Sequence, residues 1–328
     1  YIEVAVAAVC AIANENSTDA PTSRQCVRLS DITFHSAMTF ADQQNTAEER
    51  TLQVVFLPLP AGQNDRLRWR FTIGSCTAAS NPMHWTLHAS GDAEMIPDQQ
   101  RRIDIEKLRQ RCNVAIPAKN VYPLMESFEH QYGPHFQGIV NAWGDAPAPK
   151  TVVADLKLDA PAGQFHVYPA LTDSALQLLV LRTLLAKPTS DRLMFLPIKI
   201  QRIEAHLPST SLEEAPTCYE SLACYQTYSG AGLDFYGNPP KGEIQLIDPA
   251  SGLLTFECRG VAIKSMPIEG KDQKASDVEN HVLTWEWNKV PLAQHATEAG
   301  LLATPTEIVE ATKPHITEAK NKCQYYRT

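Results

Sequence analysis

The sequence has 328 residues, and its 29 basic and 37 acidic side chains give a net charge of −8. Hydrophobic residues make up 44 % of the chain and charged residues 20 %, which excludes a disordered or fibrous protein. An acidic chain without a dense lysine or arginine run lacks the electrostatic footprint of a nucleic-acid-binding protein. The longest apolar stretches, 4–13 and 176–186, are shorter than the roughly 20 residues that cross a bilayer, so no membrane span is expected.

The first 13 residues, YIEVAVAAVCAIA, predict a buried helix. At helical period, Ile2, Val6, Val9 and Ile12 form one apolar stripe, and the alanines between them allow close packing. The segment has no basic leader and no cleavage site, so it does not fit a signal peptide. Because the first residue is Tyr1 and not Met, we expect a truncated chain that begins inside a domain.

Four strand-like runs follow, at 26–40, 50–59, 67–75 and 84–93. In the third run, large apolar residues alternate with polar ones, which is typical of a sheet with one buried face. The next segment, PDQQRRIDIEKLRQR, is charged and favours a surface helix or linker.

The second half repeats this order of elements. Strand candidates at 137–143 and 152–158 precede an apolar helix at 173–186. The remaining strand candidates are 194–207, 218–228, 242–247 and 253–265. One helix with four or five antiparallel strands thus occurs twice, which predicts an α+β fold of the double hotdog type, two helix-wrapped antiparallel sheets in tandem. We expect an N-terminal hotdog over 1–96, a linker helix over 97–115, a C-terminal hotdog over 116–268 and a linker into the next domain over 269–328.

The eight cysteines show no CxxC spacing of a zinc ribbon or a redox dithiol. Most of them lie in apolar segments, which is typical of reduced thiols in a cytoplasmic protein. His84 and His88 form an HxxxH pattern, but on a strand they would stand roughly 13 Å apart, too far to share one metal ion. No glycine-rich phosphate loop is present, so no nucleotide cofactor is expected.

Two segments combine turn formers with polar side chains. In QYGPHFQGIVNAW, Gly133 and Pro134 enforce a turn directly after Tyr132. In YPALTDSALQ, Pro169 stands shortly before a predicted helix whose first residues include Asp173. A helix N-terminus stabilises a charged carboxylate, so the spacing alone favours Asp173 as an N-cap or first-turn residue.

These two segments resemble the dehydratase domains of modular polyketide synthases and animal-type fatty acid synthases. The family patterns are YGPxFQG followed by HPxLLDxxxQ. The matching positions are Tyr132, Gly133, Pro134, Phe136, Gln137, Gly138, Pro169, Leu171, Asp173 and Gln177. The segment HWTLHASG is similar to the family's W-x-x-H-A-x-G strand, and HVLTWEWNKV is similar to its exit toward the next synthase domain. The resemblance covers roughly residues 1–290.

The resemblance implies a reaction. A β-hydroxyacyl chain, carried as a thioester on the phosphopantetheine arm of an acyl carrier protein, loses water to give an α,β-unsaturated thioester. A histidine of the first hotdog takes the α-proton, and Asp173 takes the position of the general acid. Gln177, one helical turn later, would hold Asp173. Tyr132, Pro169 and Thr172 would line the substrate site.

The resemblance also implies partners and the absence of a cofactor. The partners are an acyl carrier protein, the neighbouring synthase domains and a second copy of the chain in a homodimer. No cofactor is expected to bind this domain directly.

The sequence departs from the family at several positions. The family's first motif, H-x-x-x-G-x-x-x-x-P, is absent, so we expect this polypeptide, as it stands, to lack its general base and to be inactive. Tyr168 stands where the family has histidine. Thr172 stands where it has leucine, and a hydroxyl there is expected to favour the ionised form of Asp173 by hydrogen bonding.

Other histidines are given structural interpretations. His35 is expected within an apolar strand, His88 as a packing or hydrogen-bonding residue, and His166 as an exposed strand residue. Two further functions remain open: a pseudo-dehydratase that only holds neighbouring domains, and an isomerase or cyclase on the same fold.

Overall fold

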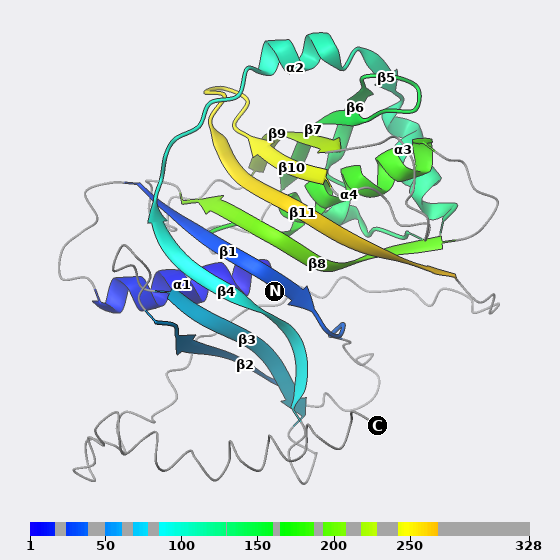
Figure 1. Ribbon diagram of the computed structural model, residues 1–328. Helices are drawn as coiled ribbons and strands as arrows, with labels where there is room; N and C mark the ends of the chain where they lie inside the picture. The colour runs from blue at the N-terminus through cyan, green and yellow to red at the C-terminus, as the bar shows by residue number, and fades with distance from the viewer. Residues whose placement is uncertain are drawn as a thin grey trace, which may run out of the picture. The chain divides into compact units, whose positions relative to one another are not determined.

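Eleven antiparallel strands form one sheet in the computed structural model of the protein (Figure 1). Their spatial order is β2-β3-β4-β1-β8-β11-β10-β9-β7-β6-β5. The structure describes residues 1–16, 24–38, 50–60, 68–77, 85–128, 130–159, 165–186, 193–207, 218–227 and 242–267. The predicted α+β class, with a long antiparallel sheet and few helices, is confirmed.

The strands fall into two groups along the chain. The first group is β1 (Gln25–Phe34), β2 (Arg50–Pro58), β3 (Arg68–Thr77) and β4 (Thr86–Pro97). The second group is β5 (Val114–Ile116), β6 (Ile139–Gly144), β7 (Thr151–Asp159), β8 (Leu193–His206), β9 (Cys218–Thr227), β10 (Gly242–Ile247) and β11 (Leu254–Pro267). Antiparallel pairing of β1 with β8 joins the two groups, so the sheet runs without a break from one half to the other.

The helices within the described ranges are α1 (Ile2–Asn16), α2 (Ile105–Arg111), α3 (Ala118–Glu126) and α4 (Pro169–Ala186), together with the 3₁₀ turn η1 (Pro134–Phe136). Helices α1 and α4 and the charged helix α2 were predicted, whereas α3 and the short strand β5 were not. The predicted start of α4 at residue 173 is wrong by four residues, because the helix begins at Pro169. The predicted linker over 269–328 lies outside the described residues.

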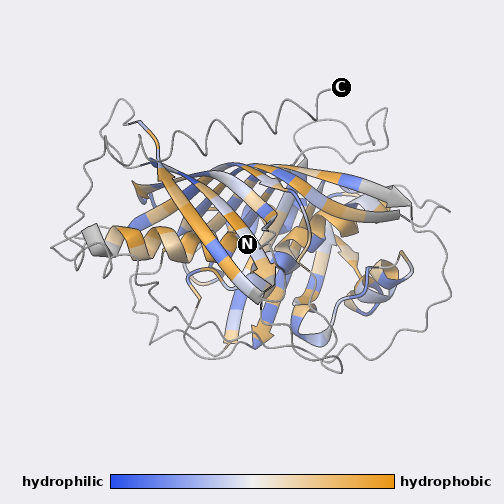
Figure 2. Ribbon diagram, turned by 90° about the horizontal axis from the view of Figure 1, so that it is seen from below, coloured by the Kyte–Doolittle hydropathy of each residue, from blue (hydrophilic) through white to orange (hydrophobic). Residues whose placement is uncertain are grey.

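One apolar core joins the inner face of the sheet to α1 and α4. Helix α1 packs on β4, β1 and β2, whereas α4 packs on β7, β9 and β10. The predicted stripe of α1 is buried at Val6 and Val9, and in β3 Trp69, Phe71 and Ile73 are buried as the alternation predicts. Figure 2 shows the same alternation of apolar and hydrophilic residues along the strands. The sheet therefore has an inner face toward the helices and an outer, polar face.

The three central strands shift their side-chain alternation in the same region. The buried positions pass from Leu29 to Ile32 in β1, from Ile203 to Ile200 in β8 and from Cys258 to Val261 in β11. Asp31 (φ 51°) and Gly260 (φ 67°) adopt left-handed backbone there, which is a local irregularity of the bulge type. A Cβ on Gly260 would lie 2.7 Å from the Cβ of Gln201. Glycine at position 260 therefore satisfies both the backbone angle and the close approach of β8.

Glu3 of α1 links the first half of the chain to the segment before α4. Its two carboxylate oxygens accept hydrogen bonds from the backbone N–H groups of His166 (2.9 Å) and Val167 (2.7 Å). The His166 ring nitrogen Nδ1 lies 3.5 Å from the same carboxylate. This one side chain therefore holds the entry to α4 against α1.

Two further expectations concern the environment of the protein. The seven cysteines in the described part of the chain are all free thiols, as predicted for reduced cysteines. Among the described residues, no helix is long and apolar enough to cross a membrane.

We predict that Glu3→Ala lowers the free energy of unfolding by about 2–3 kcal/mol, because it leaves two partly buried backbone N–H groups without an acceptor. Glu3→Gln keeps one acceptor oxygen and should lose less. Urea unfolding followed by circular dichroism measures both changes. Glu106→Ala, at an exposed position of α2, is the control and should stay within about 0.5 kcal/mol. Equal losses for Glu3→Ala and Glu106→Ala would contradict the proposed link.

Candidate functional site

Asp173 lies in the second turn of α4 and not at its start. The helix begins at Pro169, a residue suited to the first helical position because it has no N–H to satisfy. The interpretation of Asp173 as an N-cap or first-turn residue is therefore wrong. Helix termini stabilise charge only within the first turn, so Asp173 gains little from the helix dipole.

Burial dominates the electrostatics of this carboxyl group. The Asp173 residue keeps part of its surface accessible, but protein surrounds its carboxyl group, and this desolvation raises its pKa. The hydrogen bond from Gln177 opposes the shift, because it stabilises the ionised form. The net direction is upward, so Asp173 holds its proton more tightly than an exposed aspartate does. A carboxyl group in that state is suited to act as a general acid.

Gln177 is buried and makes the predicted contact with Asp173. Its amide Nε2 donates to Asp173 Oδ2 at 2.9 Å and also to the backbone oxygen of Phe136 at 2.9 Å. The side chain is only 1 % exposed, so Gln177 is not a solvated helix residue. The amide nitrogen thus connects α4 to the turn η1, which belongs to the YGPxFQG segment.

Tyr122 of α3 fixes the orientation of the Gln177 amide, and the sequence analysis did not find it. Its hydroxyl accepts from the backbone N–H of Ile139 (2.8 Å) and donates to Gln177 Oε1 (3.3 Å). With the amide oxygen engaged by Tyr122, the amide nitrogen must face Asp173. The only available signal was the four-residue spacing of Val121 and Met125, which are the buried positions of α3.

Tyr132 packs beside this chain of hydrogen bonds. Its ring lies 6.3 Å from that of Tyr122 in a T-shaped arrangement and 6.4 Å from that of His130 in a stacked one. Burial raises the pKa of the Tyr132 hydroxyl, and the nearby charges of Asp173 and Tyr122 raise it further. Tyr132 therefore stays protonated near Asp173 and remains available as a hydrogen-bond donor.

The hydroxyl of Thr172 points back to the start of α4. It donates to the backbone oxygens of Pro169 (2.9 Å) and Tyr168 (3.4 Å). A hydroxyl has one proton to donate, so the expected hydrogen bond from Thr172 to Asp173 is not made. The prediction that Thr172 favours ionised Asp173 is therefore wrong.

Gly138 of the YGPxFQG segment allows the chain to pass close to α4. A Cβ at this position would lie 2.6 Å from Ser174 Oγ and 2.9 Å from Leu158. Because the Ser174 hydroxyl is itself held by the backbone oxygen of Ala170 at 2.8 Å, it cannot move away at no cost. A glycine is thus required where this segment meets the helix that carries Asp173.

Tyr168, which replaces the family's histidine, is a packing residue in this structure. Its ring stacks on Tyr219 with centroids 5.0 Å apart, and its hydroxyl donates to the backbone oxygen of Asp159 at 3.3 Å. The residue is buried. It therefore supports the entry to α4 by aromatic contact.

Two histidines of the first half have partners on the sheet. His88 is buried, with Nε2 2.7 Å from Ser75 Oγ and Nδ1 3.3 Å from Ser36 Oγ, as expected for a hydrogen-bonding residue. His35 is exposed and follows the end of β1, with Nε2 2.8 Å from Ser90 Oγ, so its predicted place within an apolar strand is wrong.

Two other histidines are His166, which precedes α4, and His130, which contacts β8. Burial lowers the pKa of His166, but hydrogen bonds to Cys10 and Glu3 outweigh it and raise the pKa to about 10. His166 is thus partly buried and charged, which corrects its assignment as an exposed residue. His130 Nε2 accepts from the backbone N–H of Phe195 at 3.3 Å, and burial lowers its pKa. A charged His166 cannot accept a proton, and His130 has its lone pair engaged.

No group of three His, Cys, Asp or Glu residues within the described ranges could hold a metal ion, and His84 lies outside those ranges. A recess of about 200 Å³ lies on β1 and β8, and Asp173 is not among the residues that line it. The expected access of a long thioester arm to Asp173 stays a prediction.

The fold of this chain is similar to that of solved dehydratase domains. CurJ dehydratase, as an inactive mutant in complex with a compound, superposes with a TM-score of 0.64 at 20 % identity, and the match covers 81 % of each chain. An inactive mutant of CurK dehydratase gives a TM-score of 0.61 at 24 % identity over 82 % of this chain and 83 % of that one. These likenesses show the fold.

Residues 102–237 match the family model described as the polyketide synthase dehydratase N-terminal domain. In this part of its sequence, the chain is similar to that family.

Two curated relatives are similar to parts of this chain. The polyketide synthase GfsE of Streptomyces halstedii is 34 % identical over 113 residues, which are 33 % of this chain and 3 % of GfsE. A mycocerosic acid synthase-like polyketide synthase of Mycobacterium tuberculosis is 22 % identical over 244 residues, 71 % of this chain and 11 % of that protein. The chain therefore spans only a small part of these relatives.

We predict that Asp173→Asn stabilises the protein at pH 7. The pKa of Asp173 is raised in the folded state, so its contribution to stability is greatest below the unfolded pKa of about 4 and falls as the pH rises through the folded pKa. Asparagine removes this penalty. The gain should be on the order of 1 kcal/mol at pH 7 and vanish near pH 3.5.

Urea unfolding at several pH values measures this change. Asp155→Asn is the matched control, because Asp155 is a partly exposed aspartate paired with Arg109 on β7. It should show no gain at pH 7. A loss of stability in Asp173→Asn at pH 7 would contradict the raised pKa.

We predict that Tyr122→Phe costs about 1–3 kcal/mol of unfolding free energy, because it leaves the Ile139 N–H and the Gln177 carbonyl without their partner. Thermal or urea unfolding measures the loss. Tyr219→Phe, which keeps the ring stack with Tyr168, should be nearly neutral. If both variants have the same unfolding free energy, the Tyr122 hydroxyl does not fix the Gln177 amide.

Proposed function

We propose that this domain eliminates water from a β-hydroxyacyl thioester carried by an acyl carrier protein, giving an α,β-unsaturated thioester. The observation that carries this proposal is the buried Asp173 carboxyl group: burial raises its pKa, and the hydrogen bond from Gln177 fixes its orientation. Hydroxide is a poor leaving group, so a positioned acid is what the elimination requires. Similarity to the dehydratase family model supports the thioester substrate class.

In the proposed reaction, Asp173 donates its proton to the β-hydroxyl group as the C–O bond breaks. A base removes the α-proton, and the electron pair of that C–H bond forms the carbon–carbon double bond, so that water leaves. Tyr132 would donate a hydrogen bond to the β-hydroxyl and hold it toward Asp173. Pro169 and Thr172 would shape the site from the first turn of α4.

Three of the described histidines do not fit the base. His166 is charged, His88 has both ring nitrogens engaged by serine groups, and His130 accepts a backbone N–H. We therefore propose that the base is supplied by a residue outside the described ranges.

The solved structures support a reaction that uses two catalytic side chains, an aspartate and a histidine. Inactive mutants of CurK dehydratase include one Asp→Asn change and one His→Phe change. By likeness of fold, we propose that Asp173 corresponds in role to such an aspartate. We also propose that α1 with β1–β4 and α4 with β5–β11 are the two halves of a double hotdog.

The partners follow from the same assignment. The matched relatives are far longer polyketide synthases, so we propose that neighbouring synthase domains and an acyl carrier protein with its phosphopantetheine arm act with this domain. The reaction as proposed needs no cofactor bound by the domain itself. We further propose a homodimer in the cytoplasm.

A second candidate function is a pseudo-dehydratase scaffold. The observation that favours it is Tyr168, which is packed by stacking on Tyr219 where the family has a histidine. In such a scaffold, Asp173 and Gln177 would only stabilise the entry to α4.

A dehydration assay on the complete protein that contains this sequence distinguishes the two. With a 3-hydroxybutyryl thioester as substrate, we expect product formation, and we expect Asp173→Asn to lower kcat at least about 100-fold. Asp155→Asn is the control and should stay within about twofold of the parent. Product formation unaffected by Asp173→Asn would refute the acid role, and a folded parent without turnover would favour the scaffold.

A further inference from the structure

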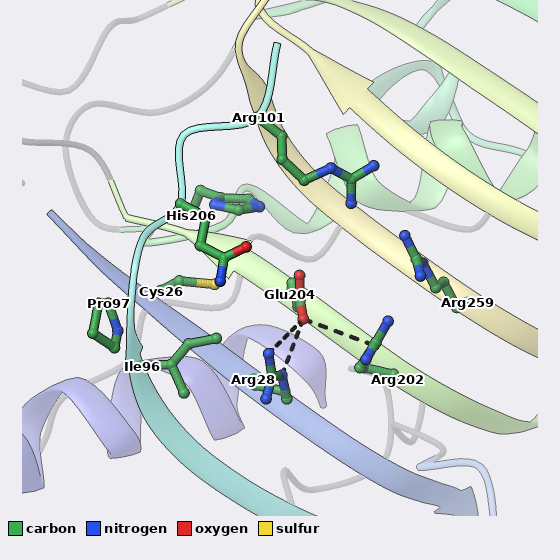
Figure 3. Close-up of a pocket in the computed structure, with 10 residues that line it drawn as sticks. Cys26, Arg28, Ile96, Pro97, Arg101, Arg202, Glu204, His206 and Arg259 are labelled. Atoms are coloured by element: carbon green, nitrogen blue, oxygen red, sulfur yellow. Dashed lines mark hydrogen bonds and ion pairs between the residues drawn. The ribbon is translucent and has the colours of Figure 1, made fainter. Parts of the chain in front are cut away.

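The outer face of the sheet carries a polar recess at the junction of the two halves (Figure 3). Its volume of about 200 Å³ is more than ten times the ~15 Å³ that one water molecule needs. Five cationic or titratable nitrogen side chains line it: Arg28, Arg101, Arg202, Arg259 and His206. Arg28 alternates with the buried Val27 and Leu29, which places the recess on the face opposite the helices. We call it the outer recess.

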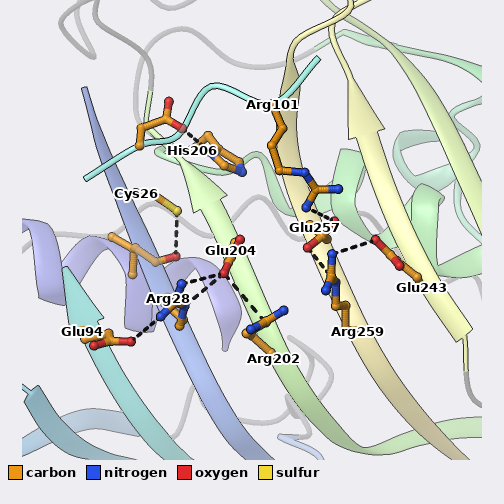
Figure 4. A network of polar contacts seen from close by, with 12 residues as sticks. Cys26, Arg28, Glu94, Arg101, Arg202, Glu204, His206, Glu243, Glu257 and Arg259 are labelled. Carbon is orange, nitrogen blue, oxygen red and sulfur yellow. Dashed lines mark hydrogen bonds and ion pairs between the residues drawn. The ribbon is translucent and has the colours of Figure 1, made fainter. Parts of the chain in front are cut away.

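The strand register places like charges opposite each other in the outer recess. Arg202 of β8 faces Arg259 of β11, and one row away Glu204 faces Glu257. Directly opposed like charges destabilise a sheet. The two glutamates compensate the arginines, and Figure 4 shows the resulting network of ion pairs. Arg101 and Arg259 approach the two oxygens of the buried Glu257, both at 2.8 Å.

Arg202 is the most weakly held of these cations. Its guanidinium Nε lies 3.7 Å from Glu204 Oε1, beyond hydrogen-bonding distance, whereas Arg28 reaches the same oxygen at 3.0 Å. The Arg202 side chain is 37 % exposed, and that of Glu204 is 13 % exposed. The acid therefore lies deeper than Arg202, whose planar donor group remains accessible from the outer recess.

His206 adds a buried nitrogen to the same place. Its side chain is only 7 % exposed, and Nδ1 lies 2.7 Å from Asp98 Oδ1. Among the described residues, no hydrogen-bond partner lies within reach of His206 Nε2. Buried polar atoms without a partner are uncommon in proteins, and each one calls for a ligand, a water or an ion.

We propose that the outer recess binds a phosphate group, either as free inorganic phosphate or as a phosphate ester. An oxyanion between Arg202 and Arg259 would relieve their mutual repulsion and accept the paired N–H groups of a guanidinium. His206 Nε2 would donate a hydrogen bond to the same oxyanion while Nδ1 donates to Asp98. This site is separate from the Asp173 cluster and does not depend on the dehydratase proposal.

The affinity should be modest and sensitive to salt. The four arginines of the outer recess are balanced by acids at its floor and rim, namely Glu94, Glu204, Glu243 and Glu257, and Asp98 adds a further negative charge behind His206. Long-range attraction is therefore weak, and binding depends on close contact with the guanidinium groups. Such contacts at a partly exposed site are screened by added salt.

Isothermal titration of the full chain with inorganic phosphate at low ionic strength tests the proposal. We expect saturable binding at one site per chain, and Arg202→Gln should weaken it at least about tenfold. Arg70→Gln is the matched control, because Arg70 lies on the same face of the sheet in β3, is paired with Asp92 and does not line the outer recess. It should leave the affinity within about twofold.

Two further arms complete the test. His206→Gln should weaken binding several-fold, and circular dichroism of each variant checks that it folds. Methyl phosphate separates the two sources: binding as tight as that of inorganic phosphate indicates an ester, and weaker binding indicates the free ion. Absence of saturable binding to either probe, or equal weakening by Arg202→Gln and Arg70→Gln, would overturn the proposal. Dehydratase activity would be unaffected by that outcome.

Discussion

The hydrogen bond from Gln177 to the buried carboxyl group of Asp173 is the contact on which the functional interpretation depends. Burial alone would raise the pKa of Asp173 but would not fix the orientation of its carboxyl group. The Gln177 amide fixes that orientation by donating a hydrogen bond to the carboxyl group. Tyr122 in turn fixes the amide, because its hydroxyl donates a hydrogen bond to the amide oxygen. Three elements of the second half, α3, η1 and α4, thus contribute to the hydrogen bonds around the Asp173–Gln177 pair. Burial of the ionisable Asp173 carboxyl group itself costs stability at neutral pH, as expected for a polar group buried for function.

On the other face of the sheet, too, charged groups are brought together and are stabilised by partners of opposite charge. Pairing of β1 with β8 brings charged rows from the two halves together, and the register sets Arg202 against Arg259. Shared glutamates offset this repulsion in part. The central strands also change their alternation together, near Asp31 and Gly260, so the apolar core stays continuous beneath this polar surface.

Local patterns predicted much of the fold. The apolar residues of the period-2 pattern in β3 and of the stripe in α1 are buried as expected, because each pattern predicts which side of its element faces the core. The start of α4 was misplaced, since Pro169 was interpreted as a residue before the helix although proline suits the first helical position. The pairing of β1 with β8 joins residues nearly 180 positions apart, which no local pattern specifies.

The candidate site was predictable only in part. The i,i+4 spacing of Asp173 and Gln177 predicts their contact, because such residues share one helix face. Tyr122 was missed because it meets Gln177 only through tertiary packing of α3 on α4. The role given to Thr172 failed for a local reason: its hydroxyl reaches the backbone of its own helix more easily than the side chain of its neighbour.

A direct titration of the Asp173 carboxyl carbon by ¹³C NMR tests the central claim most closely. The account predicts a pKa above the ordinary aspartate value of 3.8, and a further rise when Gln177 is replaced by leucine, since the amide stabilises the ionised form. A pKa at or below 3.8 in the parent protein would contradict it, because burial would then not outweigh the hydrogen bond from Gln177.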